Sequence, residues 1–87
     1  MASSMRVRVR YFASLREALG EAESLELAAG STVGALRDAL IGRGGEHGRL
    51  LARNRAVRCA LDQVMADEGD VLHDGAEVAF FPPVTGG

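Results

Sequence analysis

The residues best suited to chemistry are the last eight of the chain, residues 80–87, which read FFPPVTGG. Pro82 and Pro83 lack an N–H for a strand ladder and favour the polyproline conformation, so residues 82–87 would extend roughly 19 Å at about 3.1 Å per residue. Gly86 and Gly87 carry no Cβ, which lets the end of the chain pass through a narrow channel. The pattern predicts an extended tail made of Pro82, Pro83, Val84, Thr85, Gly86 and Gly87.

The reactive group of this predicted tail is the α-carboxylate of Gly87. A carboxylate is inert until one of its oxygens becomes a leaving group, and activation as an acyl-adenylate would open the Gly87 carbonyl to attack by sulfur or an amine. The chain has no nucleotide-binding motif, so we expect another protein to perform the activation. A frayed chain end would explain a Gly-Gly pair alone, but its attachment to a predicted strand through FFPPV favours a functional tail.

Other candidate reactive residues have simpler explanations. Cys59 is the one cysteine, which excludes an internal disulfide and a multi-cysteine metal site, and it lies on the apolar side of a predicted strand. His47 and His73 stand in polar stretches with no partner at metal-ligand spacing, so we expect both to be exposed. The glycine-rich stretch at 42–48 lacks the spacing and the lysine of a phosphate-binding loop, and we expect it to be mobile.

Two alternating segments must position the tail. Residues 5–12, MRVRVRYF, predict a strand that turns its apolar side chains to the core and its arginines, with Phe12, to the opposite face. A turn at Asp74 and Gly75 precedes a last strand, in which Phe80 faces the core and Phe81 the other side. The predicted core residues of these two strands are Val7, Val9, Tyr11, Ala76, Val78 and Phe80.

The remaining segments supply two helices and two more strands. Ser14 and Glu17 have the spacing of a capping box for a short helix that ends at Gly20, and Leu15 and Leu19 form its apolar pair. The main helix is predicted to begin at Thr32 or Ser31 and to end at Gly42, with Val33, Leu36 and Leu40 as its apolar stripe. Strands are predicted at 23–28, antiparallel to the first, and at 56–61. A short hairpin or turn region is expected at 62–72, and one helical turn at 50–52.

This order of elements predicts an α+β fold in which one main helix packs on one face of a mixed sheet. The first and last strands are expected to lie side by side and parallel, because a helix makes the crossover between them. Their C-terminal ends then share one edge, which brings Phe12 and Phe81 together on the face away from the helix. An exposed aromatic patch beside the tail predicts a surface for a partner protein.

Composition narrows the class of protein. Eighty-seven residues make one domain, which we assign to 5–81, with 1–4 as a leader or expression remnant and 82–87 as the tail. A net charge of −2 argues against nucleic-acid binding, and no apolar run reaches the length of a membrane span. The cytoplasm is the expected location. All ten basic residues are arginine, so no lysine side chain can accept an acyl group.

Three segments carry a resemblance to a known family: RVRYFASLREALG at 8–20, STVGALRDAL at 31–40 and DGAEVAFFPPVTGG at 74–87. They resemble the small-subunit family of molybdopterin synthase, whose members are ubiquitin-like β-grasp sulfur carriers. The C-terminal motif is the most specific of the three. The resemblance implies a β-grasp fold and a protein that is no enzyme on its own but the sulfur-donating subunit of a complex.

The resemblance also implies a reaction sequence. Gly87 is adenylated by an E1-like activating enzyme that uses ATP, and is then converted to a thiocarboxylate with a sulfurtransferase as sulfur donor. The sulfur passes to cyclic pyranopterin monophosphate in the active site of the large subunit, where it builds the dithiolene of molybdopterin. Phe12, Met65 and Phe81 match the family's partner-contact positions, and no bound cofactor is implied.

Two departures from the family keep an alternative open. Residues 59–63, CALDQ, replace the more usual segment containing Val-Asn, and MASS at the N-terminus is additional. Carriers for thiamine, tRNA thiolation and cysteine synthesis share the fold and the Gly-Gly end. The alternative is therefore a ubiquitin-like sulfur carrier or protein modifier of another pathway.

Overall fold

The structure is a computed structural model that describes residues 3–83. The predicted tail residues Val84, Thr85, Gly86 and Gly87 lie outside the described residues. The elements follow the order β1 (Ser4–Tyr11), α1 (Ala13–Leu19), β2 (Ala22–Ala28), α2 (Val33–Ile41), α3 (Gly45–Leu50), β3 (Arg58–Leu61), β4 (Val64–Met65) and β5 (Glu77–Phe81). The proposed division of the chain at 1–4, 5–81 and 82–87 stays a prediction.

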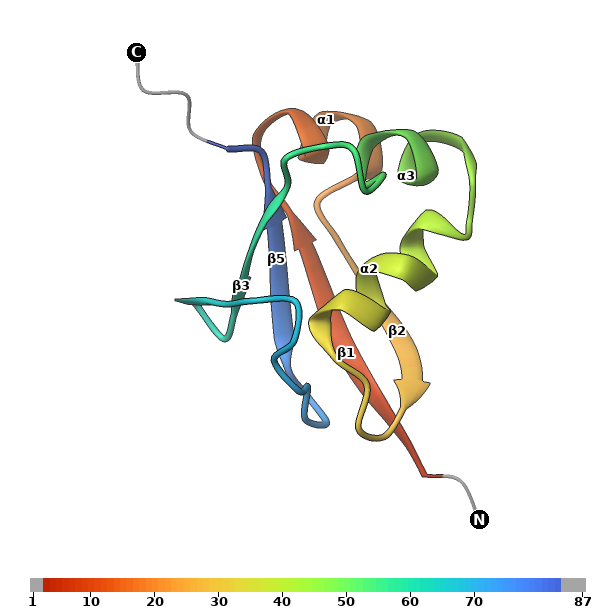
Figure 1. The fold of residues 1–87 in the computed structure, drawn as a ribbon, viewed down its shortest axis with the longest axis vertical. Coiled ribbons are helices and arrows are strands. Elements are labelled where there is room, and N and C mark those ends of the chain that lie inside the picture. Colours follow the sequence, from red (N-terminus) through yellow and green to blue (C-terminus); the bar gives the residue numbers. More distant parts are fainter. Residues whose placement is uncertain (1–2, 84–87) are drawn as a thin grey trace.

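The strands form one mixed five-stranded sheet in the order β2-β1-β5-β3-β4, with the helices on one face (Figure 1). β1 runs antiparallel to β2 and parallel to β5, and β5 runs antiparallel to β3. The expected central parallel pair is therefore confirmed. Its register places Tyr11 opposite Phe80, so the two strands end side by side next to α1 (Figure 1).

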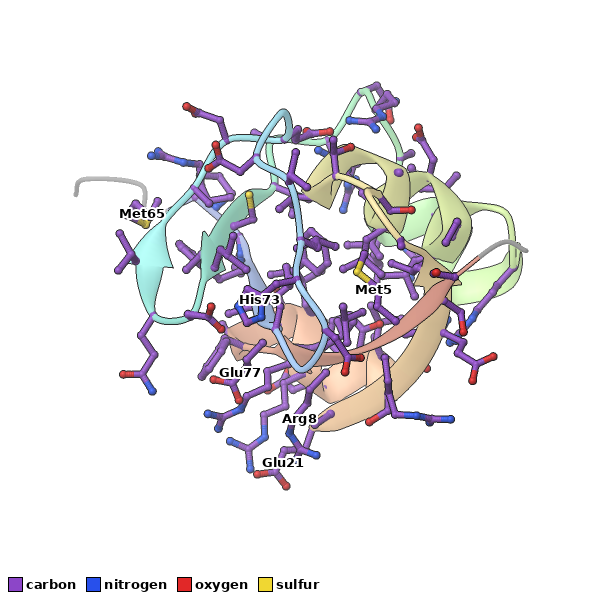
Figure 2. The ribbon with its side chains drawn as sticks, turned by 90° about the horizontal axis from the view of Figure 1, so that it is seen from below. Met5, Arg8, Glu21, Met65, His73 and Glu77 are labelled. Atoms are coloured by element: carbon purple, nitrogen blue, oxygen red, sulfur yellow. The ribbon has the colours of Figure 1, made fainter. Side chains whose placement is uncertain are left out.

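The core lies between the sheet and the helices, as strand alternation predicted. Figure 2 shows Met5 pointing to this side, whereas Arg8 and Glu77 project from the opposite face of the sheet. Removing each Val, Leu or Phe side chain from water contributes roughly 1.5–3 kcal/mol, so this cluster is the main source of stability. The side chains with less than 2% exposure are Tyr11, Phe80, Leu36, Leu40, Leu51, Val7, Val9, Val33 and Val78.

The predicted start of the main helix is confirmed at Thr32. Its Oγ1 accepts a hydrogen bond from the Ala35 amide at 3.1 Å, which satisfies one of the free N–H groups of the first turn of α2. The start predicted for the short helix is wrong. α1 begins at Ala13 with Phe12 as the preceding residue and no side-chain cap, so Ser14 lies inside the first turn and forms no capping box.

The glycine-rich stretch also differs from its prediction, because α3 covers Gly45–Leu50. Gly44 adopts a φ of 73°, which turns the chain back toward the core without steric cost. Leu50 packs against the core and Leu51 is fully buried, and these apolar anchors hold the short helix down. Of the helical turn predicted at 50–52, only Leu50 is helical, as the last residue of α3.

None of the helices described between residues 3 and 83 is long and apolar enough to span a membrane.

Candidate functional site

Phe12 and Phe81 line one hollow on the sheet face that points away from the helices. The hollow measures about 500 Å³, and we call it the outer hollow. Its lining residues are Arg10, Phe12, Ala60, Gln63, Glu77, Ala79 and Phe81. The expected meeting of the two phenylalanines is therefore confirmed, whereas their role in partner binding stays a prediction.

The two phenylalanines reach the outer hollow by different routes. Phe81 is the last residue of β5, and because successive strand residues face opposite sides, Phe80 is buried while Phe81 faces outward. Phe12 follows the end of β1, where its amide donates to the Phe80 carbonyl at 3.1 Å. The Phe12 side chain remains 37% exposed. Both aromatics therefore stand at the end of the sheet from which the chain leaves toward Pro82.

Met65 extends this surface toward the edge of the sheet. It lies in β4 opposite Ala60, a residue of the outer hollow, and it is 53% exposed. Figure 2 shows its side chain at the edge of the sheet formed by β4. Met65 is thus next to the hollow but does not line it.

Charged side chains border the apolar floor of the outer hollow. The Arg10 guanidinium carbon lies 5.1 Å from the centre of the Phe12 ring, and an Arg10 nitrogen lies 3.9 Å from Glu77 Oε1. Arg8 reaches the same Glu77 oxygen at 4.0 Å. Arg58 stands directly opposite Phe81 in the register of β3 and β5. The outer hollow therefore has an apolar centre with arginines at its border, and two of them, Arg8 and Arg10, share the carboxylate of Glu77.

Sequence reasoning missed Arg10, Ala60 and Gln63 as members of this surface. The arginines of the first strand, Arg10 among them, were predicted only to share the outward face with Phe12, and that face is the one that carries the hollow. Only the pairing of β3 with β5 brings Ala60 beside Ala79, and this register is not readable from either strand alone.

Backbone strain is concentrated beside the outer hollow. Between residues 3 and 83, the non-glycine residues with positive φ are Ala13 at 53°, Asp62 at 49° and Gln63 at 69°. Ala13 follows Phe12, and Gln63 lines the hollow. Such conformations cost on the order of 1–3 kcal/mol each and persist where surrounding contacts enforce them, which is common at functional sites.

Hydrogen bonds of the Asp62 carboxylate enforce the strained turn at Asp62 and Gln63. Asp62 Oδ1 accepts from the Glu77 amide at 3.0 Å, and Asp62 Oδ2 lies 2.6 Å from His73 Nε2. The hydrogen bond with His73 holds the pKa of the Asp62 carboxyl below its usual range and raises the pKa of His73. His73 itself is exposed, as predicted.

The prediction that His47 is exposed is wrong. Its side chain retains 21% exposure and packs edge-on against the Tyr11 ring, with 5.9 Å between ring centres. Glu23 accepts from the Tyr11 hydroxyl at 2.8 Å and lies 3.2 Å from His47 Nε2. Burial raises the pKa of the Tyr11 phenol, and so does the bond to Glu23. This cluster joins α3 to the sheet on the helix side and takes no part in the outer hollow.

Cys59 is a core residue, as predicted. It is 6% exposed, and its Sγ donates to the Ala66 carbonyl at 3.3 Å. Burial raises the pKa of the thiol, which disfavours the nucleophilic thiolate. Within residues 3–83, no group of three or more His, Cys, Asp or Glu residues is arranged to hold a metal ion.

Comparison with known proteins places these features in context. The ThiS family matches residues 9–87. A molybdopterin synthase sulfur carrier subunit of Mycobacterium tuberculosis is 40% identical over 85 residues, which cover 95% of this chain and 99% of that protein. A protein with the same name from Escherichia coli is 40% identical over 88 residues, covering 93% and 99%.

Solved structures show the same ubiquitin-like arrangement. The small archaeal modifier protein 1 of Haloferax volcanii gives a TM-score of 0.75 at 26% identity, covering 92% of this chain and 99% of that one. A complex of subunits 1 and 2 of the molybdopterin-converting factor from Helicobacter pylori contains a chain with a TM-score of 0.62 at 27% identity, covering 95% and 100%. The β-grasp prediction is therefore confirmed.

Proposed function

Because the chain belongs to the ThiS family, we propose that it is the sulfur carrier subunit of a molybdopterin synthase. Two relatives with that name, matched over nearly their whole length, support the proposal. The observation that carries it is positional: the outer hollow ends at Phe81, and the chain continues from there into Pro82. A partner that covers the hollow therefore holds the domain at the start of the tail.

The chemistry resides in the carboxylate of Gly87. In the proposed cycle, an E1-like enzyme transfers the AMP group of ATP to this carboxylate and releases pyrophosphate. A persulfide on a sulfurtransferase then attacks the Gly87 carbonyl and displaces AMP. A further thiol cleaves the resulting acyl disulfide, which yields the thiocarboxylate and a disulfide. In the synthase, this sulfur forms a bond to a carbon of cyclic pyranopterin monophosphate, and water returns an oxygen to Gly87. In this proposal the activating enzyme supplies the ATP-binding site and the large subunit supplies the site of sulfur transfer, so the chain acts as a subunit and not as an enzyme alone.

The outer hollow is the surface on which we place the large subunit. Phe12 and Phe81 are each partly exposed and supply the apolar area of this surface. Aromatic side chains in such positions dominate the free energy of many interfaces. Met65 adds an exposed, flexible apolar side chain beside it. Arg10 and Arg58 at the border favour acidic residues on the partner. The related Helicobacter pylori chain was solved in complex with its second subunit, which supports a partner of this kind.

A second function is favoured by the likeness to a small archaeal modifier protein. In that case the activated Gly87 carbonyl would be attacked by a lysine amine of a target protein instead of by sulfur, and the product would be an amide. The chain contains no lysine, so side-chain conjugation of one copy to another is excluded. Carriers that deliver sulfur in other pathways would share the thiocarboxylate and differ only in the acceptor.

Intact-mass measurement after incubation with ATP, an E1-like activating enzyme and a sulfurtransferase tests the proposal. We expect a gain equal to the difference between sulfur and oxygen, located by fragmentation at Gly87. Adding the large subunit and cyclic pyranopterin monophosphate should reverse the gain and produce the dithiolene. A thiocarboxylate that is stable to the synthase but consumed by another acceptor would assign the chain to a different pathway. No mass gain with any competent activating enzyme would contradict sulfur carriage.

A further inference from the structure

The first residues of the predicted tail, Pro82 and Pro83, line a second, smaller hollow, which we call the tail groove. It measures about 220 Å³ and is formed by α1, the end of α3 and the loop that leads to β3. Pro82 is half-buried there. The lining residues are Ser14, Leu15, Leu50, Arg55, Ala56, Val57, Pro82 and Pro83. Pro82 and Pro83 therefore leave the sheet along a groove with one wall on α1 and the other at 55–57.

The wall at 55–57 belongs to a segment without regular structure that is wrapped around one buried side chain. Arg37 of α2 is 4% exposed, although arginine is rarely buried. Its Nε donates to the Leu51 carbonyl at 2.7 Å, and its Nη2 donates to the carbonyls of Ala52 at 2.8 Å and Arg55 at 3.1 Å. Its charge is balanced by Glu68, whose carboxylate accepts from Nη1 at 2.9 Å.

The segment is also fastened from its outer side. The Arg53 guanidinium donates to the Gly34 carbonyl at 3.1 Å and to Asp38 Oδ1 at 2.7 Å, and it pairs with Glu68. Arg53 is about half exposed, so these bonds compete with water and contribute little.

The Nε donor of Arg37 is buried and has no such competition from water, so its loss would leave the Leu51 carbonyl without this partner. The carbonyls of Ala52 and Arg55 also accept from the Arg55 amide at 2.9 Å and the Val57 amide at 3.0 Å, and Arg37 gives each a second donor. Arg37 is therefore the group that fixes the loop.

We propose that Arg37 is a positioning residue for sulfur transfer: by fixing the 55–57 wall of the tail groove, it sets the direction in which Pro82 and Pro83 leave the domain. This inference rests on the proposed function. Pro82 and Pro83 have a fixed φ and form a stiff pair, so a small rotation at Pro82 changes the direction in which the rest of the tail begins. When the domain is docked through the outer hollow, that direction decides whether Gly87 arrives at the reacting atom of the acceptor.

The test compares Arg37→Gln with Arg53→Gln, a matched loss of one guanidinium from the same loop network. Each variant is converted to the thiocarboxylate, its affinity for the large subunit is measured, and sulfur transfer is followed in a single turnover. We expect Arg37→Gln to bind with unchanged affinity and to transfer sulfur roughly tenfold more slowly or worse, because small misplacements of reacting groups are expensive. Arg53→Gln should be close to the unchanged protein in both measurements.

A third variant separates an effect on the tail from a loss of folding in Arg37→Gln. Ala56→Leu keeps Arg37 and fills the tail groove, so it should also slow transfer without weakening binding. Equal transfer rates for Ala56→Leu and the unchanged protein would overturn the inference, as would equal losses for Arg37→Gln and Arg53→Gln. NMR contacts between Pro82 and Val57, which Arg37→Gln should abolish, test the groove without sulfur chemistry. If these contacts respond as expected but the unchanged protein carries no sulfur, the proposed function fails and the role of Arg37 in tail direction stands.

Discussion

The two adjacent phenylalanines at the end of β5 have opposite environments. At the scale of single residues, we therefore expect Phe80 to contribute to folding stability and Phe81 to partner binding. Phe80 is 1% exposed in the core, and replacing such a ring by alanine typically lowers the free energy of unfolding by roughly 3–5 kcal/mol. Phe81 lines the outer hollow instead. Its removal should leave the core packing unchanged, so we expect its effect at the proposed partner interface.

We expect Phe81→Ala to weaken binding of the large subunit by about 2 kcal/mol, the magnitude of an interface hot spot, with little change in the free energy of unfolding. Isothermal titration calorimetry and chemical denaturation measure the two quantities. Val71→Ala is the matched control, because Val71 is a 62% exposed apolar residue that does not line the outer hollow. Unchanged affinity combined with lost stability would instead assign Phe81 to the core.

At the scale of elements, the Asp62 carboxylate ties the strained turn between β3 and β4 to the turn before β5 and to the start of β5. Both ring nitrogens of His73 face oxygens: Nε2 faces Asp62 Oδ2 at 2.6 Å, and Nδ1 faces the Asp74 carbonyl at 2.9 Å. Only the imidazolium can donate to both, so protonation of His73 strengthens the link. Gln63 of this turn lines the outer hollow, which connects the link to the proposed interface.

The link should therefore depend on pH in a defined direction. The hydrogen bond with Asp62 raises the pKa of His73, so its contribution is complete below the ordinary histidine value of about 6.5 and is lost as the pH rises through the folded pKa. The pKa of Asp62 is lowered, so its contribution is present above about 3.9 and is lost as the pH falls through the folded value. An NMR titration of His73 should show a midpoint above that of a free histidine.

Asp62→Asn provides the control for this titration. Asparagine can still accept the hydrogen bond from the Glu77 amide through its carbonyl oxygen, but it removes the negative charge beside His73. We expect the midpoint of His73 to fall toward its ordinary value in this variant. A midpoint that does not move would show that Asp62 is not the cause of the shift.

Elements with strong periodicity were predictable, and elements fixed by tertiary contacts were not. The alternation of β1 and β5 correctly assigned Val7, Phe80 and the outward Phe81, because side-chain direction in a strand follows from position alone. The start of α1 was missed, because Ala13 takes a φ of 53° that no local signal indicates. α3 was missed because it is held by Leu51, which packs from outside the helix.

The site was predictable to the same extent. The meeting of Phe12 and Phe81 follows from strand parity and the parallel pairing of β1 with β5. His47 was assigned to solvent because its partners, Tyr11 and Glu23, are more than twenty residues away in the chain. Arg37 looks like an ordinary polar position of an amphipathic helix, and only the packing of the loop over it reveals its buried donors.

At the scale of the whole molecule, the sheet places the outer hollow and the start of the tail at Pro82 at the same end of the domain. β1 and β5 run parallel and end side by side (Figure 1). Phe12, Phe81 and the start of the tail at Pro82 therefore lie at one end of the sheet. In the proposed function, docking through the outer hollow and delivery by Gly87 are coupled through the length of residues 82–87. A carrier of this design should be sensitive to tail length and insensitive to most changes elsewhere on its surface.

The length of the tail gives the last prediction. Deleting Gly87, or adding one alanine after it, displaces the terminal carboxylate by about 3.1 Å in an extended chain, beyond hydrogen-bonding tolerance at a reacting centre. We expect both variants to lose sulfur transfer while their thermal unfolding and their affinity for the large subunit match those of the unchanged protein. Ser3→Ala is the control, because this exposed residue precedes β1 and leaves the tail intact. Transfer that survives either change of length would mean that the terminal carboxylate is not the group that carries sulfur.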